Sequence, residues 1–299
     1  MTPNIVRNHH GFHAVAEPPS EEQLSEYYAQ VYFQEERVYQ KRYDDAELGH
    51  LDDKLRLKEA LIRPFLPEVE QLSLLDVGCG EGFTLPFFAD RGWRVLGTDH
   101  SDFAVRQHNP QYAGCFERGS FMEVLNRLDM RGERFTVVWL DNVVEHVRDP
   151  LALLQRCAAV TQPGGLLLVD VPNDFSRLQE AAVEKSLAPD RFWLALPDHL
   201  SYFNAAGIRS LAEEAGWQHC RTVSDFPIDF NLFNPAANYV ADRTRGRSAH
   251  TQRQALERLF VSISEEKTLD LYEALADMGL GRSINAVFKR LPTPTSAGT

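Results

Sequence analysis

Short apolar segments typical of strands alternate with segments typical of helices between residues 73 and 172. The strand-like segments are 73–78, 94–100, 115–120, 135–142 and 164–172. One helix-like segment separates each pair: 83–92, 102–109, 121–128 and 150–161. Strands separated by single helices form right-handed βαβ units, which build a parallel sheet with helices on both faces. The apolar runs TVVWL and LLLVDV favour central strands that are buried on both faces, so we predict an α/β fold.

The flanking segments predict a covering structure around this core. Residues 1–20 are polar and contain prolines, so we expect them to be loosely ordered. We predict helices over 20–43, 52–65, 205–217 and 251–275, a polar and aromatic excursion over 222–250, and a last strand over 283–290. The chain then divides into a tail with covering helices (1–70), a core (71–221), and a part that holds a substrate cap, a helix and the last strand (222–299).

Net charge, apolar runs and cysteine spacing argue against several classes of protein. The formal net charge is −12 at pH 7, which opposes a nucleic-acid partner, because such proteins normally carry a basic surface. No apolar run reaches the roughly 18 residues that a membrane span needs. The N-terminal segment lacks the apolar region of a secretory signal, and the four cysteines form no CxxC pair. We therefore expect a cytoplasmic protein without membrane contact.

The segment LLDVGCGEGF, residues 74–83, is a strand that runs into three glycines at alternate positions. Glycine permits a tight turn and lets a ligand approach the backbone without a Cβ in the way. In an open parallel sheet the ligand lies at the carboxyl ends of the strands. A G-x-G-x-x-G dinucleotide fingerprint requires glycine at position 83, where this chain has Phe83. A nicotinamide-dependent dehydrogenase therefore fits the spacing poorly.

The segment DVGCGEG (76–82) instead resembles motif I of the class I S-adenosylmethionine (SAM) dependent methyltransferases. The resemblance continues in order through VLGTDHS, GSF, DNVVEHVRDP, PGGLLLVDVP and DHLSYFNAAGIRSLAEEAGW, and covers residues 72–217. It implies a Rossmann-like fold with a mostly parallel seven-stranded sheet and helices on both faces. The layout is similar to that of bacterial small-molecule enzymes, including the O-methyltransferases of ubiquinone synthesis.

The resemblance implies that SAM is the cofactor. Asp99 would hold both ribose hydroxyls through charge-assisted hydrogen bonds. Ser120 and Phe121 would contact adenine, although many relatives have Asp at position 120. Asp76 would orient the glycine loop or meet the amino group of SAM, and Asp141 would face the methionyl end. The complete set of expected SAM contacts in this core is Asp76, Gly78, Gly80, Gly82, Asp99, Ser120, Phe121, Asp141 and Asn142.

Two histidines lie where the resemblance places the mouth of the active site. His146 follows the fourth strand in NVVEHV, and His199 lies in PDHLSYF. SAM carries its own reactive methyl group, so the protein chiefly supplies positioning and electrostatics. A hydroxyl acceptor also benefits from a general base, for which histidine has a suitable pKa. We predict that His146 and His199 are catalytic, while structural roles for both stay open.

The Glu-His pair of this segment has a second interpretation. Some relatives, including ubiquinone-pathway and small-RNA 2′-O-methyltransferases, carry E-x-x-E-H here and use it to bind a divalent metal. In this chain Asn142 replaces the first glutamate, and relatives with the pattern LEHV-DP need no metal. We therefore expect no metal. A site made of Glu145, His146 and His199, with Asn142 as a weak oxygen ligand, remains the alternative.

The N-terminal helix carries tyrosines that the resemblance places over the SAM pocket. Tyr28 and Tyr32 are four residues apart and therefore share one helix face. We expect both to contact the cofactor. Burial of the same face against the core is the alternative.

Arginines gather in the segment NPAANYVADRTRGRSAHTQR of this acidic chain. Guanidinium groups suit phosphate or carboxylate, so Arg243 and His250 are expected to contact an anionic acceptor. A solvated loop is the alternative interpretation.

Together these features predict methyl transfer from SAM to a hydroxyl of a small molecule: a sugar, a polysaccharide precursor or a secondary metabolite. An RNA 2′-O-methyltransferase is a second hypothesis, which the net charge opposes. A catalytically silent SAM-binding protein is a third, which the intact glycine loop and Asp99 oppose. The sequence leaves homo-oligomer formation open.

Overall fold

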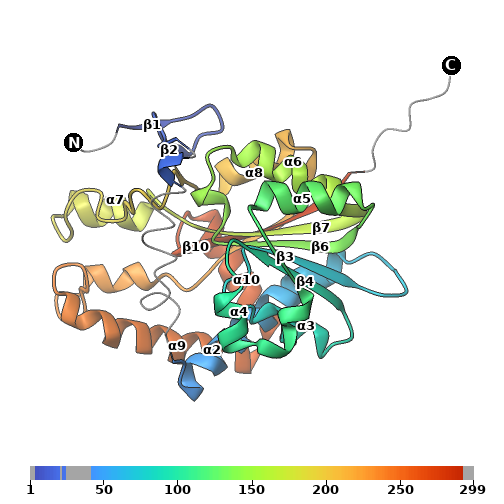
Figure 1. Ribbon diagram of the computed structural model, residues 1–299. Coiled ribbons are helices and arrows are strands. Elements are labelled where there is room, and N and C mark those ends of the chain that lie inside the picture. The colour runs from blue at the N-terminus through green and yellow to red at the C-terminus, as the bar shows by residue number, and fades with distance from the viewer. Residues whose placement is uncertain (1–3, 21, 25–41, 292–299) are drawn as a thin grey trace.

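The computed structural model describes residues 4–20, 22–24 and 42–291 of the chain. Seven strands form one sheet in the order β5-β4-β3-β6-β7-β10-β9 (Figure 1). β10 is antiparallel to both of its neighbours, and the other strand pairs of this sheet are parallel. This arrangement confirms the predicted Rossmann-like sheet. The strands are β3 (Ser73–Val77), β4 (Arg94–Asp99), β5 (Phe116–Arg118), β6 (Phe135–Asp141), β7 (Thr161–Pro172), β9 (Trp217–Ser224) and β10 (Ser283–Arg290).

Helices cover both faces of the sheet (Figure 1). One face carries α5 (Phe121–Met130), α6 (Pro150–Val160) and α8 (Ala205–Glu214), and the other carries α2 (Asp45–Ile62), α3 (Thr84–Ala89) and α10 (Glu265–Asp277). The central strand β6 sends alternate side chains to the two cores: Val138 and Leu140 to the first, and Val137 and Trp139 to the second. A strand buried on both faces explains why its sequence is continuously apolar.

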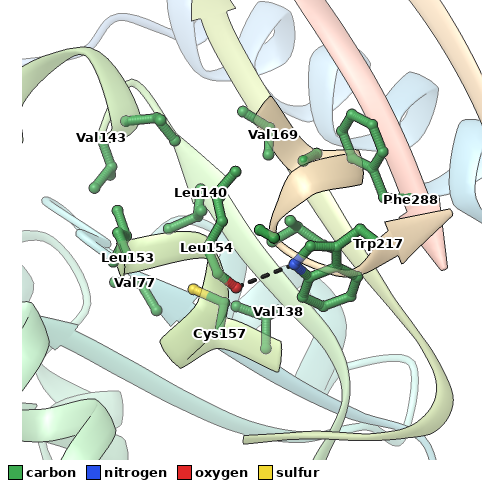
Figure 2. Close-up of a cluster of buried hydrophobic side chains, with 14 of the residues drawn as sticks. Val77, Val138, Leu140, Val143, Leu153, Leu154, Cys157, Val169, Trp217 and Phe288 are labelled. Carbon is green, nitrogen blue, oxygen red and sulfur yellow. Dashed lines mark hydrogen bonds between the residues drawn. The ribbon is translucent and has the colours of Figure 1, made fainter. Parts of the chain in front are cut away.

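Figure 2 shows part of the first core, where Trp217 at the start of β9 packs against α6. The Trp217 side chain is buried, and its indole N–H donates a hydrogen bond of 3.0 Å to the carbonyl oxygen of Leu154. A buried indole N–H needs such a partner to offset its loss of hydration. This contact helps to position the last two strands against the parallel core.

The expectation that residues 1–20 are loosely ordered is wrong for the described residues 4–20. β1 (Ile5–Arg7) and β2 (His13–Val15) form an antiparallel hairpin, and β2 pairs with β8 (Ser201–Tyr202) in a second, three-stranded sheet. Three-residue strands are too short to show an alternating pattern in the sequence. Their partner β8 is remote in the chain, so local sequence did not indicate the pairing.

Two predicted helices have different limits in the structure. α2 begins at Asp45, because Asp44 and Glu47 form a capping box before the predicted start at residue 52. The helix predicted over 251–275 is two helices, α9 (Gly246–Ile263) and α10, and the Ser264 side chain caps the second. The remaining elements are α4 (Phe103–His108), α7 (Arg177–Glu184) and the 3-10 turns η1 (Arg63–Phe65), η2 (Pro110–Cys115), η3 (Val144–His146), η4 (Ile228–Phe233) and η5 (Arg243–Arg245).

No helix in the described part of the chain has the length and apolar character that a membrane crossing requires.

Candidate active site

The glycine loop joins β3 to α3 at the carboxyl end of the sheet. Its backbone is held by β4, because the N–H of Gly78 donates to the carbonyl oxygen of Thr98 at 2.7 Å. All three glycines have positive φ angles, which favours glycine at each position. A Cβ on Gly78 would lie 2.5 Å from Val143, whereas one on Gly80 would meet nothing within 4 Å. The loop is therefore closely packed at Gly78 and faces open space at Gly80.

Two carboxylates flank this open space. Asp99 ends β4 and accepts hydrogen bonds from the backbone N–H of Gly80 at 3.1 Å and of His100 at 2.6 Å. Burial raises the pKa of Asp99, and these two donors partly offset that rise. Asp76 is 2% exposed and accepts a hydrogen bond from the Thr84 hydroxyl. Its Oδ1 atom has no partner among the described residues, and burial raises its pKa to about 7.

The predicted adenine contacts lie at the start of α5. Ser120 is the N-cap of this helix and forms a capping box with Glu123. Phe121 lies across the glycine loop, where its ring would be 3.5 Å from a Cβ on Gly78. The ring centroid of His100 lies 5.0 Å from that of Phe121. His100 therefore joins this aromatic wall, although sequence reasoning did not single it out.

Sequence reasoning also missed Lys58, which reaches Asp141 and Asp170 from α2. Its Nζ lies 2.5 Å from Asp141 Oδ2 and 2.7 Å from Asp170 Oδ2. Asp141 and Asp170 are neighbours in the β6–β7 register, so the ammonium bridges two adjacent strand ends. Lys58 is 7% exposed. Burial disfavours its charged form, but the two carboxylates outweigh burial and raise the pKa of Lys58.

Asp141 and Asn142 follow β6 at this same edge. Burial opposes the ionisation of Asp141, but Lys58 outweighs it and lowers the Asp141 pKa. Asn142 has a φ of 54° and donates from its side chain to Asp141 at 2.8 Å. Its backbone N–H donates to the carbonyl oxygen of Asp170 at 2.9 Å. These bonds hold the turn after β6 in one conformation, beside the glycine loop.

His146 and His199 are brought together, as the sequence predicted for one active-site mouth. Their ring centroids are 4.9 Å apart, and the backbone N–H of Leu200 donates to the carbonyl oxygen of Glu145 at 2.8 Å. His146 Nδ1 lies 2.8 Å from the carbonyl oxygen of Asp198. A carbonyl only accepts hydrogen bonds, so this contact assigns the proton of neutral His146 to Nδ1.

A buried carboxylate lies behind His199. The Nδ1 atom of His199 is 3.9 Å from Oδ2 of Asp174, whose side chain is 1% exposed. The other oxygen of Asp174 accepts a hydrogen bond of 2.8 Å from the Arg282 guanidinium. Burial lowers the pKa of His199 to about 4, and His146 adds to this effect. His199 is therefore neutral at pH 7.

Glu145 completes a group of three possible metal ligands. One ligand atom each from Glu145, His146 and His199 lies within 4.8 Å of the others. Glu145 is 1% exposed, and neither carboxylate oxygen has a hydrogen-bond partner among the described residues. Burial raises the Glu145 pKa well above its usual value, which favours the protonated acid. The Asn142 side chain donates from its nitrogen to Asp141, and this bond does not use the side-chain oxygen that the alternative metal set would require.

The two predicted cap contacts lie in η5 and in the first turns of α9. Arg243 lies in η5, and its side chain forms no hydrogen bond or ion pair with any described residue. The His250 ring lies 6.1 Å from that of His50, which borders a cavity of about 40 Å³ together with Lys58. Such a cavity has room for about three water molecules but not for an acceptor. Tyr28 and Tyr32 lie outside the described residues.

Comparison with known proteins shows which family the chain resembles. A family model for the methyltransferase domain matches residues 48–221, more than half of the chain. The chain is 30% identical over 146 residues to a probable SAM-dependent methyltransferase of Mycolicibacterium smegmatis, which is 48% of this chain and 51% of that protein. It is 39% identical over 105 residues to the ubiquinone biosynthesis O-methyltransferase of Bradyrhizobium sp. strain ORS 278, which is 34% of this chain and 40% of that protein. The matches therefore span about half or less of each relative.

Solved structures agree in fold. A SAM-dependent methyltransferase from Archaeoglobus fulgidus aligns with a TM-score of 0.53 at 17% identity, covering 87% of this chain and all of that one. The [4+2]-cyclase SpnF aligns with a TM-score of 0.52 at 15% identity, covering 92% of this chain and 98% of that one. The second name describes a different reaction, so fold alone does not define chemistry. By its family match and its fold, the chain belongs to the methyltransferase-domain family of class I SAM-dependent methyltransferases.

Proposed function

We propose that the protein transfers the methyl group of SAM to a hydroxyl group of a small molecule. One observation carries the proposal: neutral His199 lies at the edge of the sheet that also holds the glycine loop. Its Nδ1 atom is 3.9 Å from the buried carboxylate of Asp174. The segment that carries His146 joins His199 to the glycine loop. His146 lies in η3, and Val143, immediately before η3, packs on Gly78. Relatives named as O-methyltransferases support an oxygen acceptor.

The residues at the loop fit SAM. Open space lies over Gly80, where a Cβ would meet nothing, and Asp99 stands at its border with a fixed carboxylate. The unpartnered Oδ1 of buried Asp76 suits a donor such as the SAM amino group. Phe121 offers an apolar face for adenine. When bound, SAM would supply a methyl group that is activated by the neighbouring sulfonium.

His199 would act as the general base. Shortening of the 3.9 Å separation between Asp174 Oδ2 and His199 Nδ1 to hydrogen-bond distance would place the proton on Nδ1 and leave the Nε2 lone pair to accept the acceptor's hydroxyl proton. Asp174 would then stabilise the imidazolium that forms, while Arg282 holds Asp174 in place. His146, fixed by the carbonyl of Asp198, would form the adjacent wall of the acceptor site.

The acceptor class is part of this proposal. We infer a sugar, a polysaccharide precursor or a secondary metabolite, because the acidic chain disfavours RNA. An anionic acceptor would require a cation, and Arg243 lacks a partner among the described residues. The four cysteines are unpaired, which supports a reducing, cytoplasmic setting.

The test is release of S-adenosylhomocysteine (SAH) from SAM in the presence of three acceptor groups: catechols, free and nucleotide-linked sugars, and short RNA. Each assay is run with and without a chelator, because the Glu145 group offers possible metal ligands. We expect release with a small hydroxylated acceptor and none with RNA. Release with RNA alone would contradict the acceptor class. SAM binding without release from any acceptor would favour a silent binding protein, and loss of activity on chelation would favour the metal alternative.

A further inference from the structure

A second group of possible metal ligands lies outside the active site, at the turn of the N-terminal hairpin. His9 and His10 follow β1, and Glu214 ends α8. Glu214 Oε2 lies 3.6 Å from His9 Nε2 and 3.5 Å from His10 Nε2. The three ligand atoms all lie within 4.8 Å of one another. Residues far apart in the chain are therefore brought together by the packing of the hairpin on α8.

These separations suit a tetrahedral zinc ion. Zinc binds histidine nitrogen and carboxylate oxygen at about 2.0–2.2 Å, which places neighbouring ligand atoms about 3.4 Å apart. Both contacts of Glu214 are close to this value. The exposed position of His9 and Glu214, with side chains 77% and 49% exposed, leaves the fourth position open to water.

The His10 ligand is held in place by its surroundings. Its side chain is 5% exposed, and Nδ1 lies 3.0 Å from Oγ of Ser210. Metal-binding histidines usually direct the second ring nitrogen to a hydrogen-bond acceptor in this way, because it fixes the ring and the tautomer. Ser210 and Glu214 are four residues apart, so one face of α8 supplies both the support and a ligand. The ring also lies parallel to that of buried Phe12, with centroids 6.0 Å apart.

We propose that His9, His10 and Glu214 form a zinc site that fastens the N-terminal hairpin to α8. The hairpin already contacts the start of this helix, where the Asn204 side chain donates to the carbonyl oxygen of Gly11 at 2.9 Å. Figure 1 shows β1 and β2 beside the layer that contains α8. The metal would add a second attachment at the other end of α8. The site is distinct from the Glu145 group and does not depend on the proposed methyl transfer.

The experiment is calorimetric titration of the purified, metal-free full chain with zinc. We expect Glu214→Gln and His10→Ala each to lose one zinc equivalent relative to the unchanged protein. Ser210→Ala should keep that equivalent with affinity reduced by roughly 10–100-fold, because it removes only the support of His10. Glu213→Gln is the matched control, since Glu213 is the adjacent carboxylate on α8 and pairs with Arg209 instead.

Thermal unfolding supplies a second readout. Zinc should raise the melting temperature of the unchanged protein and of Glu213→Gln, because a ligand that binds only the folded state stabilises it. The increase should be smaller in Glu214→Gln, which lacks the carboxylate ligand on an exposed side chain. An unchanged zinc stoichiometry in Glu214→Gln, or equal losses in both glutamate variants, would overturn the site. SAH binding should be the same in all these variants, so this failure is distinguishable from failure of the proposed function.

Discussion

Replacing His199 by alanine is expected to lower kcat for methyl transfer by at least tenfold, and by up to roughly 10⁴-fold. The variant removes the imidazole whose Nδ1 atom lies 3.9 Å from the buried carboxylate of Asp174. SAH affinity should change little, because the contacts proposed for the cofactor lie on the glycine loop, Asp99 and Phe121. A loss in kcat at constant cofactor affinity identifies an interaction of the transition state rather than of the ground state.

The control for this variant is His219→Ala, which removes a half-buried histidine on β9 whose Nε2 contacts Thr222 at 2.8 Å. Steady-state kinetics of both variants should be measured with calorimetric SAH binding. In the unchanged protein kcat/KM should fall as the pH decreases toward about 4, where His199 takes up a proton and ceases to be a base. An unchanged kcat in His199→Ala would exclude His199 as the base.

Replacing Lys58 by methionine is expected to lower the free energy of unfolding by about 3–5 kcal/mol. Methionine retains the apolar stem but leaves Asp141 and Asp170 facing each other without a cation. Their mutual repulsion should raise their pKa in the folded state, so the folded protein would bind more protons than the unfolded chain. The decrease in the free energy of unfolding should therefore be larger at pH 8 than at pH 5, where protonation of the carboxylates relieves their repulsion.

Chemical denaturation at both pH values measures this effect. Lys267→Met, on the exposed surface of α10, is the control and should change stability by less than about 0.5 kcal/mol. The double variant Lys58→Met/Asp170→Asn should regain part of the loss, because it removes one of the two facing carboxylates. Equal stability of Lys58→Met and Lys267→Met would show that the bridge contributes nothing.

The central sheet and the residues at the carboxyl ends of its parallel strands were predictable because the sequence patterns that indicate them are local. Each βαβ unit carries its own periodicity, and Gly78, Gly80 and Asp99 lie directly at strand ends. Their positions follow once the strands pair in register. The pairing of His146 with His199 was also anticipated, through the resemblance that places both segments at the mouth of the active site.

The remaining features depend on contacts between remote segments. Lys58 is an ordinary helix residue in the sequence, and only the packing of α2 places it between two strand ends. Arg282 has no local signal, yet it holds Asp174 across the site. The N-terminal hairpin needs β8 as its partner, so polar composition led to the wrong expectation for residues 4–20. The capping residues Asp44 and Ser264, by contrast, were readable in the sequence and would have placed two helix boundaries better.

Calorimetric titration with SAH tests the central claim that the glycine loop and Asp99 form the cofactor site. We expect one binding site in the unchanged protein and at least a tenfold weaker affinity in Asp99→Asn, because each hydrogen bond to a charged group contributes about 1.5–3 kcal/mol. Asp102→Asn, three residues further and paired with Arg106, should bind SAH as the unchanged protein does. Absence of SAH binding, or equal affinity in Asp99→Asn, would contradict the account.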